Sequence, residues 1–354
     1  MIGKITIAGI ALSLSLGAPS LADDCALKRF ASLDMIAGPD GSIAIPVLIQ
    51  GASYRFRLNA FGPGQIGSNL ADQLKLEREP VPDKLPMFVD GHQIKNMVSI
   101  PAPSLGGEGG RLDLPQAKVP EDPSPQSNAT EPEGTLGHEY LRYFDLDLDF
   151  GNGKLNLFSP EHCAGKVVYW AKEYTDVPID FLLSLQSITA KGRSPDPGAF
   201  SKTMPTPSGK KIQFSTLPDS FDGSLNGNVV PVSINTEIAH SRMSMDMAQA
   251  LFDLAPNSPG IETIAGTGED RGVHYRYRFA SLKIGNIEVK NPDIELWPTD
   301  PAAEEKLAAR LPPQLLDRLP KPPALELGTD ILRQLHIYFA ANEGKFYVTA
   351  ADAH

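Results

Sequence analysis

The sequence predicts a mostly β protein with short helices, built as two similar lobes by an internal duplication. The chain of 354 residues contains 31 Gly and 32 Pro, above average usage, which is typical of a protein rich in strands and loops. Several apolar segments alternate with a period of two, and one block of sequence occurs twice. With a hydrophobic content of 41%, the chain is long enough for two domains with their own cores.

The stretch 45–59 is predicted to form a β-hairpin. It reads IPVLIQGASYRFRLN, in which an apolar run at 45–49 leads into a Gln50-Gly51 turn. Apolar and polar residues then alternate through 52–58, as expected for a strand with one buried face. The hairpin delivers the chain into Asn59-Ala60-Phe61.

A second block occurs twice and identifies the duplication. Residues 135–158 contain an apolar-Gly element, a short helical stretch and a hairpin, and residues 326–348 repeat this pattern without a gap. The matched pairs, each 191 residues apart, are Gly137 and Gly328, Leu141 and Leu332, Arg142 and Arg333, Gly153 and Gly344, and Lys154 and Lys345. We therefore expect two lobes, each closed by one copy of this block.

The opening hairpin is expected to have a second copy as well. Val230-Pro231-Val232 resembles Ile45-Pro46-Val47, so 230–235 is interpreted as the first strand and 238–243 as the second. Asn59 follows Pro46 by 13 residues, and the same spacing from Pro231 leads to Ser244. Asn59 and Ser244 are thus predicted to occupy corresponding positions in the two lobes.

These blocks resemble those of the retropepsin-like and pepsin-like aspartic proteases, over about residues 41 to 350. In that family a hairpin carries the catalytic Asp-Thr-Gly turn of each lobe, and a Gly element, a short helix and a hairpin close the lobe. The resemblance implies a pepsin-like, two-lobed fold from duplicated retropepsin-like barrels, with a cleft between the lobes. At the Asp-Thr-Gly positions this chain has Asn59-Ala60-Phe61 and Ser244-Met245-Asp246.

The substitutions remove the chemistry that the family uses. Two carboxyl groups about 3 Å apart share one proton, so that one activates water while the other donates to the scissile carbonyl. Neither the Asn59 amide nor a Ser244 hydroxyl without a base can take a proton from water. The leading hypothesis is a catalytically silent homologue that binds an extended peptide in the cleft. The predicted cleft residues are Asn59, Ala60, Phe61, Ser244, Met245 and Asp246.

Two other functions stay open. A register slip would present Asp246, or folding would bring another acid into the cleft, and the protein would then be an active aspartic endopeptidase. Alternatively the stretch 101–134, rich in Pro, Gly, Ser and Glu, is an exposed mobile loop through which a structural or assembly protein acts. Deamidation of Asn59 is disfavoured by Ala60, and no Gly-x-Ser-x-Gly motif supports a Ser244 nucleophile.

The N-terminus predicts export. Residues 1–22 read as a cleavable signal peptide, with Lys4 before an apolar core and a cut after Ala22. The two cysteines, Cys25 and Cys163, are expected to form a disulfide in an oxidising compartment, periplasmic or extracellular. A net charge of -11 disfavours nucleic acid and anionic membranes as partners, and we expect a monomer without metal or cofactor.

The predicted domain boundaries follow from these elements. The first lobe spans 23–190, an irregular linker 191–227 and the second lobe 228–354. In the second lobe, Gly266-Thr267-Gly268 and the alternating residues 273–279 predict a long hairpin in the position of a flap. A short helix between prolines is expected within 301–323.

Overall fold

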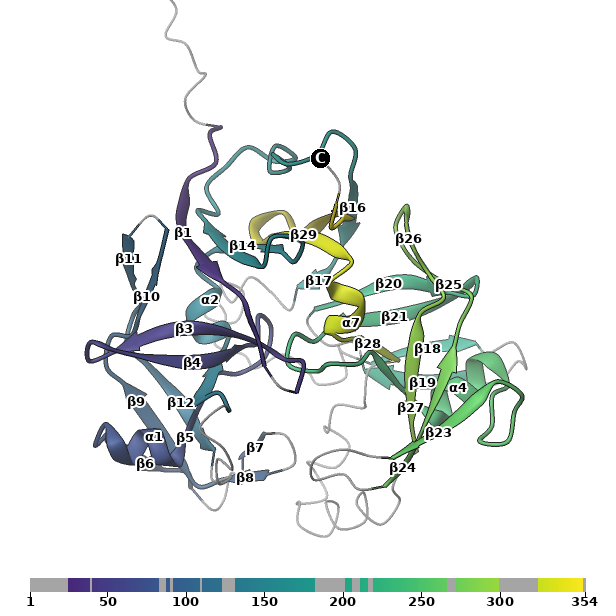
Figure 1. Cartoon of the computed structure of the whole chain (residues 1–354), viewed down its shortest axis with the longest axis horizontal. Helices are drawn as coiled ribbons and strands as arrows, with labels where there is room; N and C mark the ends of the chain where they lie inside the picture. Colours follow the sequence, from purple (N-terminus) through teal and green to yellow (C-terminus); the bar gives the residue numbers. More distant parts are fainter. Residues whose placement is uncertain are drawn as a thin grey trace, which may run out of the picture.

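The computed structural model describes residues 25–38, 40–82, 87–89, 92–108, 110–122, 131–181, 201–205, 211–215, 219–265, 272–298 and 324–352. The predicted signal peptide, the helix expected within 301–323 and the Gly266-Thr267-Gly268 segment lie outside these residues. Figure 1 shows two groups of strands side by side, with a third group above and between them.

The first lobe is built on a sheet of ten strands. Its strands are β2 (Ile36–Ala37), β3 (Ile43–Ile49), β4 (Ala52–Leu58), β5 (Gln65–Gly67), β6 (Arg78–Pro80), β9 (Asn96–Ile100), β10 (Ser104–Gly107), β11 (Gly110–Asp113), β12 (Ala117–Asp122) and β13 (Gly134–Leu136). The hairpin of β7 (Met87–Val89) and β8 (His92–Ile94) and the helices α1 (Ser68–Gln73) and α2 (His138–Leu141) complete the lobe.

The hairpin predicted at 45–59 is confirmed as β3 and β4, with Ile45 opposite Phe56. Both residues are buried, as the alternation of apolar and polar side chains predicts. The turn residues Gln50 and Gly51 have φ values of 52° and 84°, the left-handed conformations that tight hairpin turns require.

The prediction of an exposed mobile loop at 101–134 is wrong for most of that stretch. It contains β10, β11 and β12, and β12 pairs with β9 at residues 117–120 and with β5 at residues 121–122. Val119 is fully buried, and even Glu121 is 6% exposed. The many Pro and Gly residues of this stretch favoured the prediction of a loop, because its short strands show little alternation of apolar and polar residues. Residues 123–130 lie outside the described part of the chain.

The second lobe repeats this plan. Its elements are β17 (Asp180–Phe181), β20 (Asp219–Leu225), β21 (Asn228–Ile234), β22 (Arg242–Ser244), α4 (Met245–Phe252), β23 (Ile261–Ala265), β24 (Val273–Arg278), β25 (Ser281–Ile284), β26 (Ile287–Lys290), β27 (Asp293–Trp297), β28 (Leu325–Leu327) and α7 (Thr329–Leu332). A separate hairpin of β18 (Ser201–Pro205) and β19 (Lys211–Ser215) lies between β17 and β20 in the chain. β20, inside the stretch assigned to a linker at 191–227, pairs with β21 and so belongs to this sheet.

A six-stranded sheet joins the lobes, and we call it the joining sheet. Its strands, in order, are β1 (Arg29–Asp34), β15 (Lys154–Phe158), β14 (Asp145–Asp149), β29 (Leu335–Ala340), β30 (Lys345–Ala350) and β16 (Thr175–Pro178), with the short helix η2 (Ala341–Glu343) between β29 and β30. Asp147 on β14 faces Tyr338 on β29. These two residues are 191 positions apart, so the duplicated blocks meet here about an approximate two-fold axis.

The structure therefore confirms the mostly β class and the duplicated, two-lobed organisation. One continuous apolar cluster runs through both lobes, and it includes Ile45 and Leu136 from the first and Ile234 and Leu327 from the second. The predicted disulfide between Cys25 and Cys163 is present, with 4.9 Å between the Cα atoms. Among the described residues, no helix has the length and apolarity to cross a membrane.

Candidate functional site: the two crossing turns

The turn after β4 is held by backbone bonds to the closing block of its own lobe. The Asn59 backbone N–H donates to the Leu136 carbonyl at 3.0 Å, and the His138 N–H donates to the Gly62 carbonyl at 2.9 Å. The turn thereby passes directly over Gly137. A Cβ atom at Gly137 would lie 2.0 Å from the Gly64 nitrogen, so only glycine fits beneath this turn.

The turn after β21 is its counterpart in the second lobe. The Asn235 N–H donates to the Leu327 carbonyl at 2.9 Å, and the Thr329 N–H donates to the Ile238 carbonyl at 2.9 Å. This turn passes over Gly328, where a Cβ atom would lie 2.6 Å from a backbone carbon of His240. The two hydrogen-bond patterns match residue by residue, so Asn235 corresponds to Asn59.

The predicted correspondence of Asn59 and Ser244 is therefore corrected. Ser244 is the last residue of β22 and the N-cap of α4, where its Oγ accepts a hydrogen bond from the Met247 N–H at 3.2 Å. Met245 is buried in the core, and Asp246 is exposed in the first turn of the helix. Ser244, Met245 and Asp246 thus come after the second-lobe turn in the chain and are not part of it.

The error in register has a simple cause. Val230-Pro231-Val232 lies on β21, the second strand of its hairpin, whereas the similar segment at 45–47 lies on the first strand, β3. The true first strand is β20, whose sequence DSFDGSL carries little apolar alternation. The second-lobe turn is thus Asn235-Thr236-Glu237.

Two side chains of the second turn cross to the first lobe. The Glu237 carboxylate accepts a hydrogen bond from Asn59 Nδ2 at 2.5 Å and another from Thr135 Oγ1 at 3.2 Å. Thr236 Oγ1 donates to the Leu58 carbonyl, which lies immediately before Asn59. Asn59 and Glu237 are half-buried, whereas Thr135 and Thr236 are buried.

The orientation of the Asn59 amide follows from its neighbours. Asn59 Oδ1 accepts a hydrogen bond from the Gly62 N–H at 2.6 Å, and a backbone N–H can only donate. Nδ2 must therefore point toward Glu237. In the second lobe, Asn235 Oδ1 likewise accepts from the Glu237 N–H of its own turn, at 3.0 Å.

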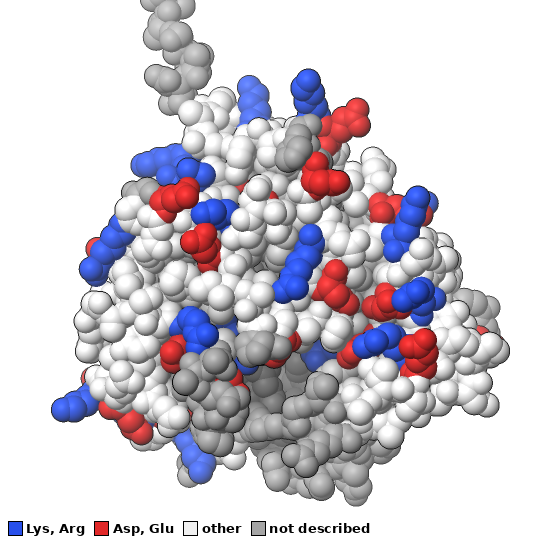
Figure 2. All heavy atoms as spheres, in the orientation of Figure 1, with Lys and Arg blue, Asp and Glu red and all other residues white. Residues whose placement is uncertain are grey.

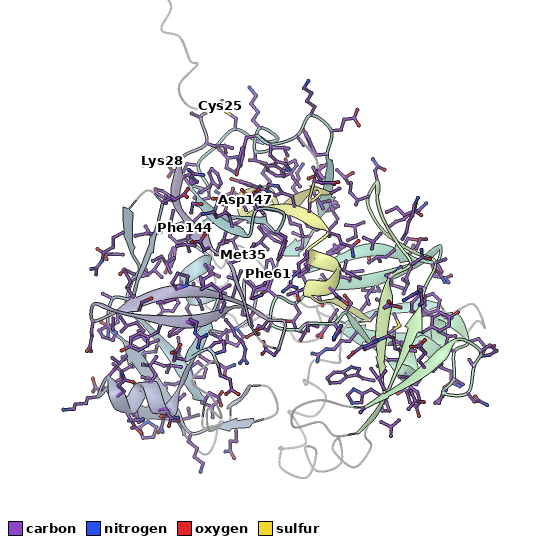
Figure 3. The ribbon with its side chains drawn as sticks, in the orientation of Figure 1. Cys25, Lys28, Met35, Phe61, Phe144 and Asp147 are labelled. Atoms are coloured by element: carbon purple, nitrogen blue, oxygen red, sulfur yellow. A yellow bond between two sulfur atoms is a disulfide. The ribbon has the colours of Figure 1, made fainter. Side chains whose placement is uncertain are left out.

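The first turn sends an apolar side chain toward the junction between the lobes. Phe61 packs edge-to-face against Phe339 of the joining sheet, with ring centroids 4.8 Å apart. Figure 3 shows Phe61 at this junction, below the strand that carries Asp147. Ala60 is buried beside it. Of the predicted site residues, Asn59, Ala60 and Phe61 thus lie at the junction.

Sequence reasoning missed Glu237, the acid that lies against Asn59. One signal could have found it: Leu58-Asn59 and Ile234-Asn235 both place an Asn directly after the last aliphatic residue of a strand. An alignment of the two lobes on these pairs, and not on Pro46 and Pro231, would have placed Asn235 opposite Asn59. The described turns Asn59-Ala60-Phe61 and Asn235-Thr236-Glu237 together contain one carboxylate, where an acid pair needs two.

Among the described residues, no group of three or more His, Cys, Asp or Glu is arranged to hold a metal ion. On the face shown in Figure 2, basic and acidic side chains are interspersed, so no single-sign field covers it.

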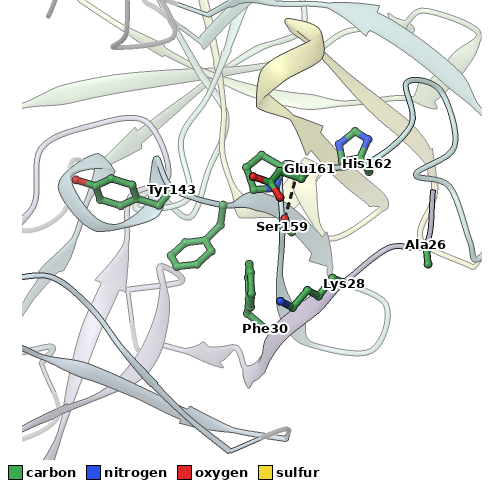
Figure 4. A pocket seen from close by; sticks show the side chains of 9 residues that line it. Ala26, Lys28, Phe30, Tyr143, Ser159, Glu161 and His162 are labelled. Carbon is green, nitrogen blue, oxygen red and sulfur yellow. Dashed lines mark hydrogen bonds between the residues drawn. The ribbon is translucent and has the colours of Figure 1, made fainter. Parts of the chain in front are cut away.

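A pocket of about 820 Å³ lies apart from the turns, beside β1 (Figure 4). Its lining residues are Ala26, Lys28, Phe30, Tyr143, Phe144, Ser159, Pro160, Glu161 and His162. The Phe30 and Phe144 rings pack edge-to-face with centroids 5.8 Å apart, and Lys28 Nζ lies 5.2 Å from the Phe30 ring centre. The crossing turns contribute nothing to this lining.

The duplicated lobes, crossing turns and joining sheet together define a two-lobed, mostly β scaffold. No protein-family model matches the chain, and no curated protein matches its sequence. Among solved structures, the chain is similar to basic 7S globulin from soybean, with 8% sequence identity and a TM-score of 0.44. That match covers 93% of this chain and 96% of the globulin chain.

Proposed function

We propose that the protein is an exported, catalytically silent relative of the aspartic endopeptidases that binds an extended polypeptide segment between its lobes. One observation supports this most strongly. The two corresponding turn positions, where the family resemblance expects acids, both carry amides, Asn59 and Asn235, while the backbone bonds around them are intact.

The amides remove the paired-acid mechanism. An Asn side chain donates and accepts hydrogen bonds, but it neither takes a proton from water nor returns one to a leaving amine. Glu237 supplies one carboxylate, and its near partner at 2.5 Å is the Asn59 amide. Of the described turn residues Asn59-Ala60-Phe61 and Asn235-Thr236-Glu237, Glu237 alone carries a carboxyl group, whereas the family's mechanism shares a proton between two.

Strand addition is a way for the second lobe to hold an extended segment. β23 lies at one end of the second-lobe sheet and pairs with β24 on one side. An extended peptide can add to such an edge through backbone hydrogen bonds, with side-chain pockets giving selectivity. The β23–β24 hairpin is also the element predicted in the position of a flap.

The disulfide between Cys25 and Cys163 supports the proposed export, because disulfides persist in oxidising compartments outside the cytoplasm. The proposal places the mature N-terminus at Asp23. Mass spectrometry of the protein recovered outside the cytoplasm tests this directly, and retention of residues 1–22 would count against it.

The main experiment combines cleavage and binding. The purified mature chain is incubated with a reduced, carboxymethylated protein from pH 3 to 7, with and without pepstatin, and binding of the same labelled polypeptide is followed by fluorescence anisotropy. We expect binding without cleavage. Pepstatin-sensitive cleavage would overturn the silent assignment, and absence of binding at any pH would overturn the proposed ligand class.

A second candidate, hydrolysis by a single acid, is favoured by the contact between Glu237 and Asn59. In that case Glu237 takes the proton of water while the amide steadies the oxyanion. The same assay distinguishes it: cleavage would be lost in Glu237→Gln and kept in Asp246→Ala. The exposed position of Asp246 on α4 makes that acid the matched control.

A further inference from the structure

The pocket beside β1 lies between two segments that are far apart in the sequence. Ala26, Lys28 and Phe30 belong to the first segment, and residues 159–162 form the second. The Ser159 N–H donates to the Lys28 carbonyl at 2.9 Å, and the disulfide joins the residues directly outside the pocket, Cys25 and Cys163. A backbone hydrogen bond and a covalent bond therefore hold both sides of the pocket in place, which lowers the cost of ordering them around a ligand.

Aromatic rings form the apolar part of this pocket. Phe30 and Phe144 pack edge-to-face and are half-buried, and Tyr143 is 46% exposed. The Arg142 guanidinium donates to the Tyr143 hydroxyl at 2.8 Å and lies 4.9 Å from the centre of its ring, so it holds that ring in position. Aromatic surface that is open to water binds an apolar side chain, because the contact removes both from solvent.

The pocket also contains a cation and an anion, Lys28 and Glu161, on its two sides (Figure 4). Lys28 Nζ lies 5.2 Å from the centre of the Phe30 ring, and the Glu161 backbone N–H donates to Ser159 Oγ at 3.2 Å. Within the described part of the chain, neither charged side chain forms an ion pair, with the other or with a third residue. Both are exposed, so both charges are accessible to a ligand in the pocket.

We propose that this pocket binds a free dipeptide with apolar side chains. Its carboxylate pairs with Lys28, its ammonium with Glu161, and its side chains pack on Phe30 and Phe144. Lys28 and Glu161 do not contact each other, so they suit a ligand whose two charges are separated by a peptide bond. A ligand with one charge leaves Lys28 or Glu161 unmatched and brings a like charge toward it. The volume of about 820 Å³ is typical of pockets for small ligands. The inference goes beyond the proposed function, because the crossing turns contribute nothing to this pocket.

The test uses ligands that differ by one charged group or by their side chains. The probe is the dipeptide Leu-Phe; its N-acetyl form lacks the ammonium, its amide lacks the carboxylate, and Gly-Gly keeps both charges without apolar side chains. Isothermal titration calorimetry measures each against the purified mature chain at about pH 6, where both termini of the dipeptide are charged. We expect Leu-Phe to bind roughly fivefold more tightly than either blocked form, as for partly exposed ion pairs. Gly-Gly should bind most weakly.

Variants then locate the effect. Lys28→Met should abolish the preference for Leu-Phe over its amide and keep the preference over the N-acetyl form, and Glu161→Gln should do the reverse. Lys290→Met and Glu288→Gln, which remove exposed charges of β26, are matched controls and should keep both preferences. Circular dichroism and thermal unfolding establish that each variant is folded, and the ligand series on the unmodified chain decides independently of them.

The outcomes separate this inference from the proposed function. Absence of Leu-Phe binding, or equal affinity for Leu-Phe and its two blocked forms, would overturn the inference. Preferences that survive both Lys28→Met and Glu161→Gln would place the dipeptide elsewhere and overturn it as well. Saturating Leu-Phe should leave binding of the carboxymethylated polypeptide unchanged, and displacement would contradict the location in this pocket. If the polypeptide does not bind while Leu-Phe shows both preferences, the proposed function fails and the dipeptide site stands.

Discussion

The lobes meet at two polar regions that differ in how completely their charges are matched. At the crossing turns, one half-buried carboxylate, Glu237, lies against an amide, Asn59. Behind the joining sheet, Asp145 and Asp147 are fully buried against two histidines, His162 and His336. The first region is partly open to solvent, whereas the acids of the second are buried against histidines.

In the second region each histidine lies between two carboxylates. His162 Nε2 is 2.6 Å from Asp145 Oδ2, and its Nδ1 is 3.7 Å from Glu343 Oε1. His336 Nε2 is 2.6 Å from Asp147 Oδ1, and its Nδ1 is 3.8 Å from Asp149 Oδ1. Buried charges are tolerated when they are paired in this way.

Aromatic side chains then pack over this layer. Trp170 stacks on His336 with ring centres 3.8 Å apart, and Tyr169 donates its hydroxyl to Asp147 Oδ2 at 2.5 Å. The segment that carries both rings follows Cys163, which the disulfide ties to Cys25. The comparison teaches that buried acids alone do not mark a site. What distinguishes the turns is that the contact between Asn59 and Glu237 is only half-buried.

The largest expected effect breaks the second, buried region. Asp147→Ala removes the acceptor for His336, Tyr169 and Asn156 and leaves buried polar groups without their partner. We expect a loss of about 3–5 kcal/mol in the free energy of unfolding, measured by urea titration. Glu237→Ala at the half-buried turn is the comparison, and an equal loss there would contradict the distinction between the regions.

The next prediction concerns the backbone beneath the first turn. Gly137→Ala pushes a Cβ atom into the Gly64 nitrogen, and the turn must move to admit it. We expect a loss of about 1–3 kcal/mol, as for overpacked cores. Gly51→Ala is the contrasting variant: its φ of 84° strains an L-residue but a Cβ atom there meets nothing within 4 Å, whereas Gly137 has an ordinary φ of -107°. Since the φ of Gly137 does not require glycine, we assign its loss to the close approach of the turn, and an unchanged stability in Gly137→Ala would contradict this.

A smaller effect is expected in the pH dependence of stability, through the buried carboxyl group of Asp145. Burial is the main cause that raises the pKa of Asp145, and it outweighs the bonds from Ala341 and His162 that lower it. A raised pKa in the folded protein contributes stability that is present below the ordinary pKa of Asp and lost as pH rises through the folded value. Asp145→Asn should therefore flatten the decline in stability with rising pH. An unchanged slope would assign that decline to other groups.

Sequence patterns predicted what depends on neighbouring residues along the chain. The hairpin at 45–59 and the 191-residue repeat are local signals, and both are confirmed. The second turn was misplaced because the hydrogen bonds of Asn235 to Leu327 and Thr329 to Ile238 define it, and these are contacts between distant segments. The similar triplets around Pro46 and Pro231 gave a stronger sequence match, but they lie on different strands of the two hairpins.

The contact of Glu237 with Asn59 could not be predicted at all, because it depends on how two lobes pack. The same holds for the polar layer: Asp145, Asp147 and Asp149 alternate with leucines on β14, yet all three acids are buried. An alternating strand normally turns its polar face to water. Here a tethered segment from elsewhere in the chain covers that face, which no local pattern reveals.

Asn59 and Glu237 face each other across the two turns, and one set of pH-dependent unfolding measurements tests this contact most directly. Asn59→Asp places two carboxyl groups in contact, so the pair shares a proton and its upper pKa rises above that of the unfolded chain. The stability of this variant, relative to the unmodified protein, should fall by roughly 1–2 kcal/mol as pH rises from 4 to 7. Adding Glu237→Gln should abolish that fall, and adding Asp246→Asn should leave it unchanged. A fall that survives Glu237→Gln, or one that only Asp246→Asn removes, would contradict the account.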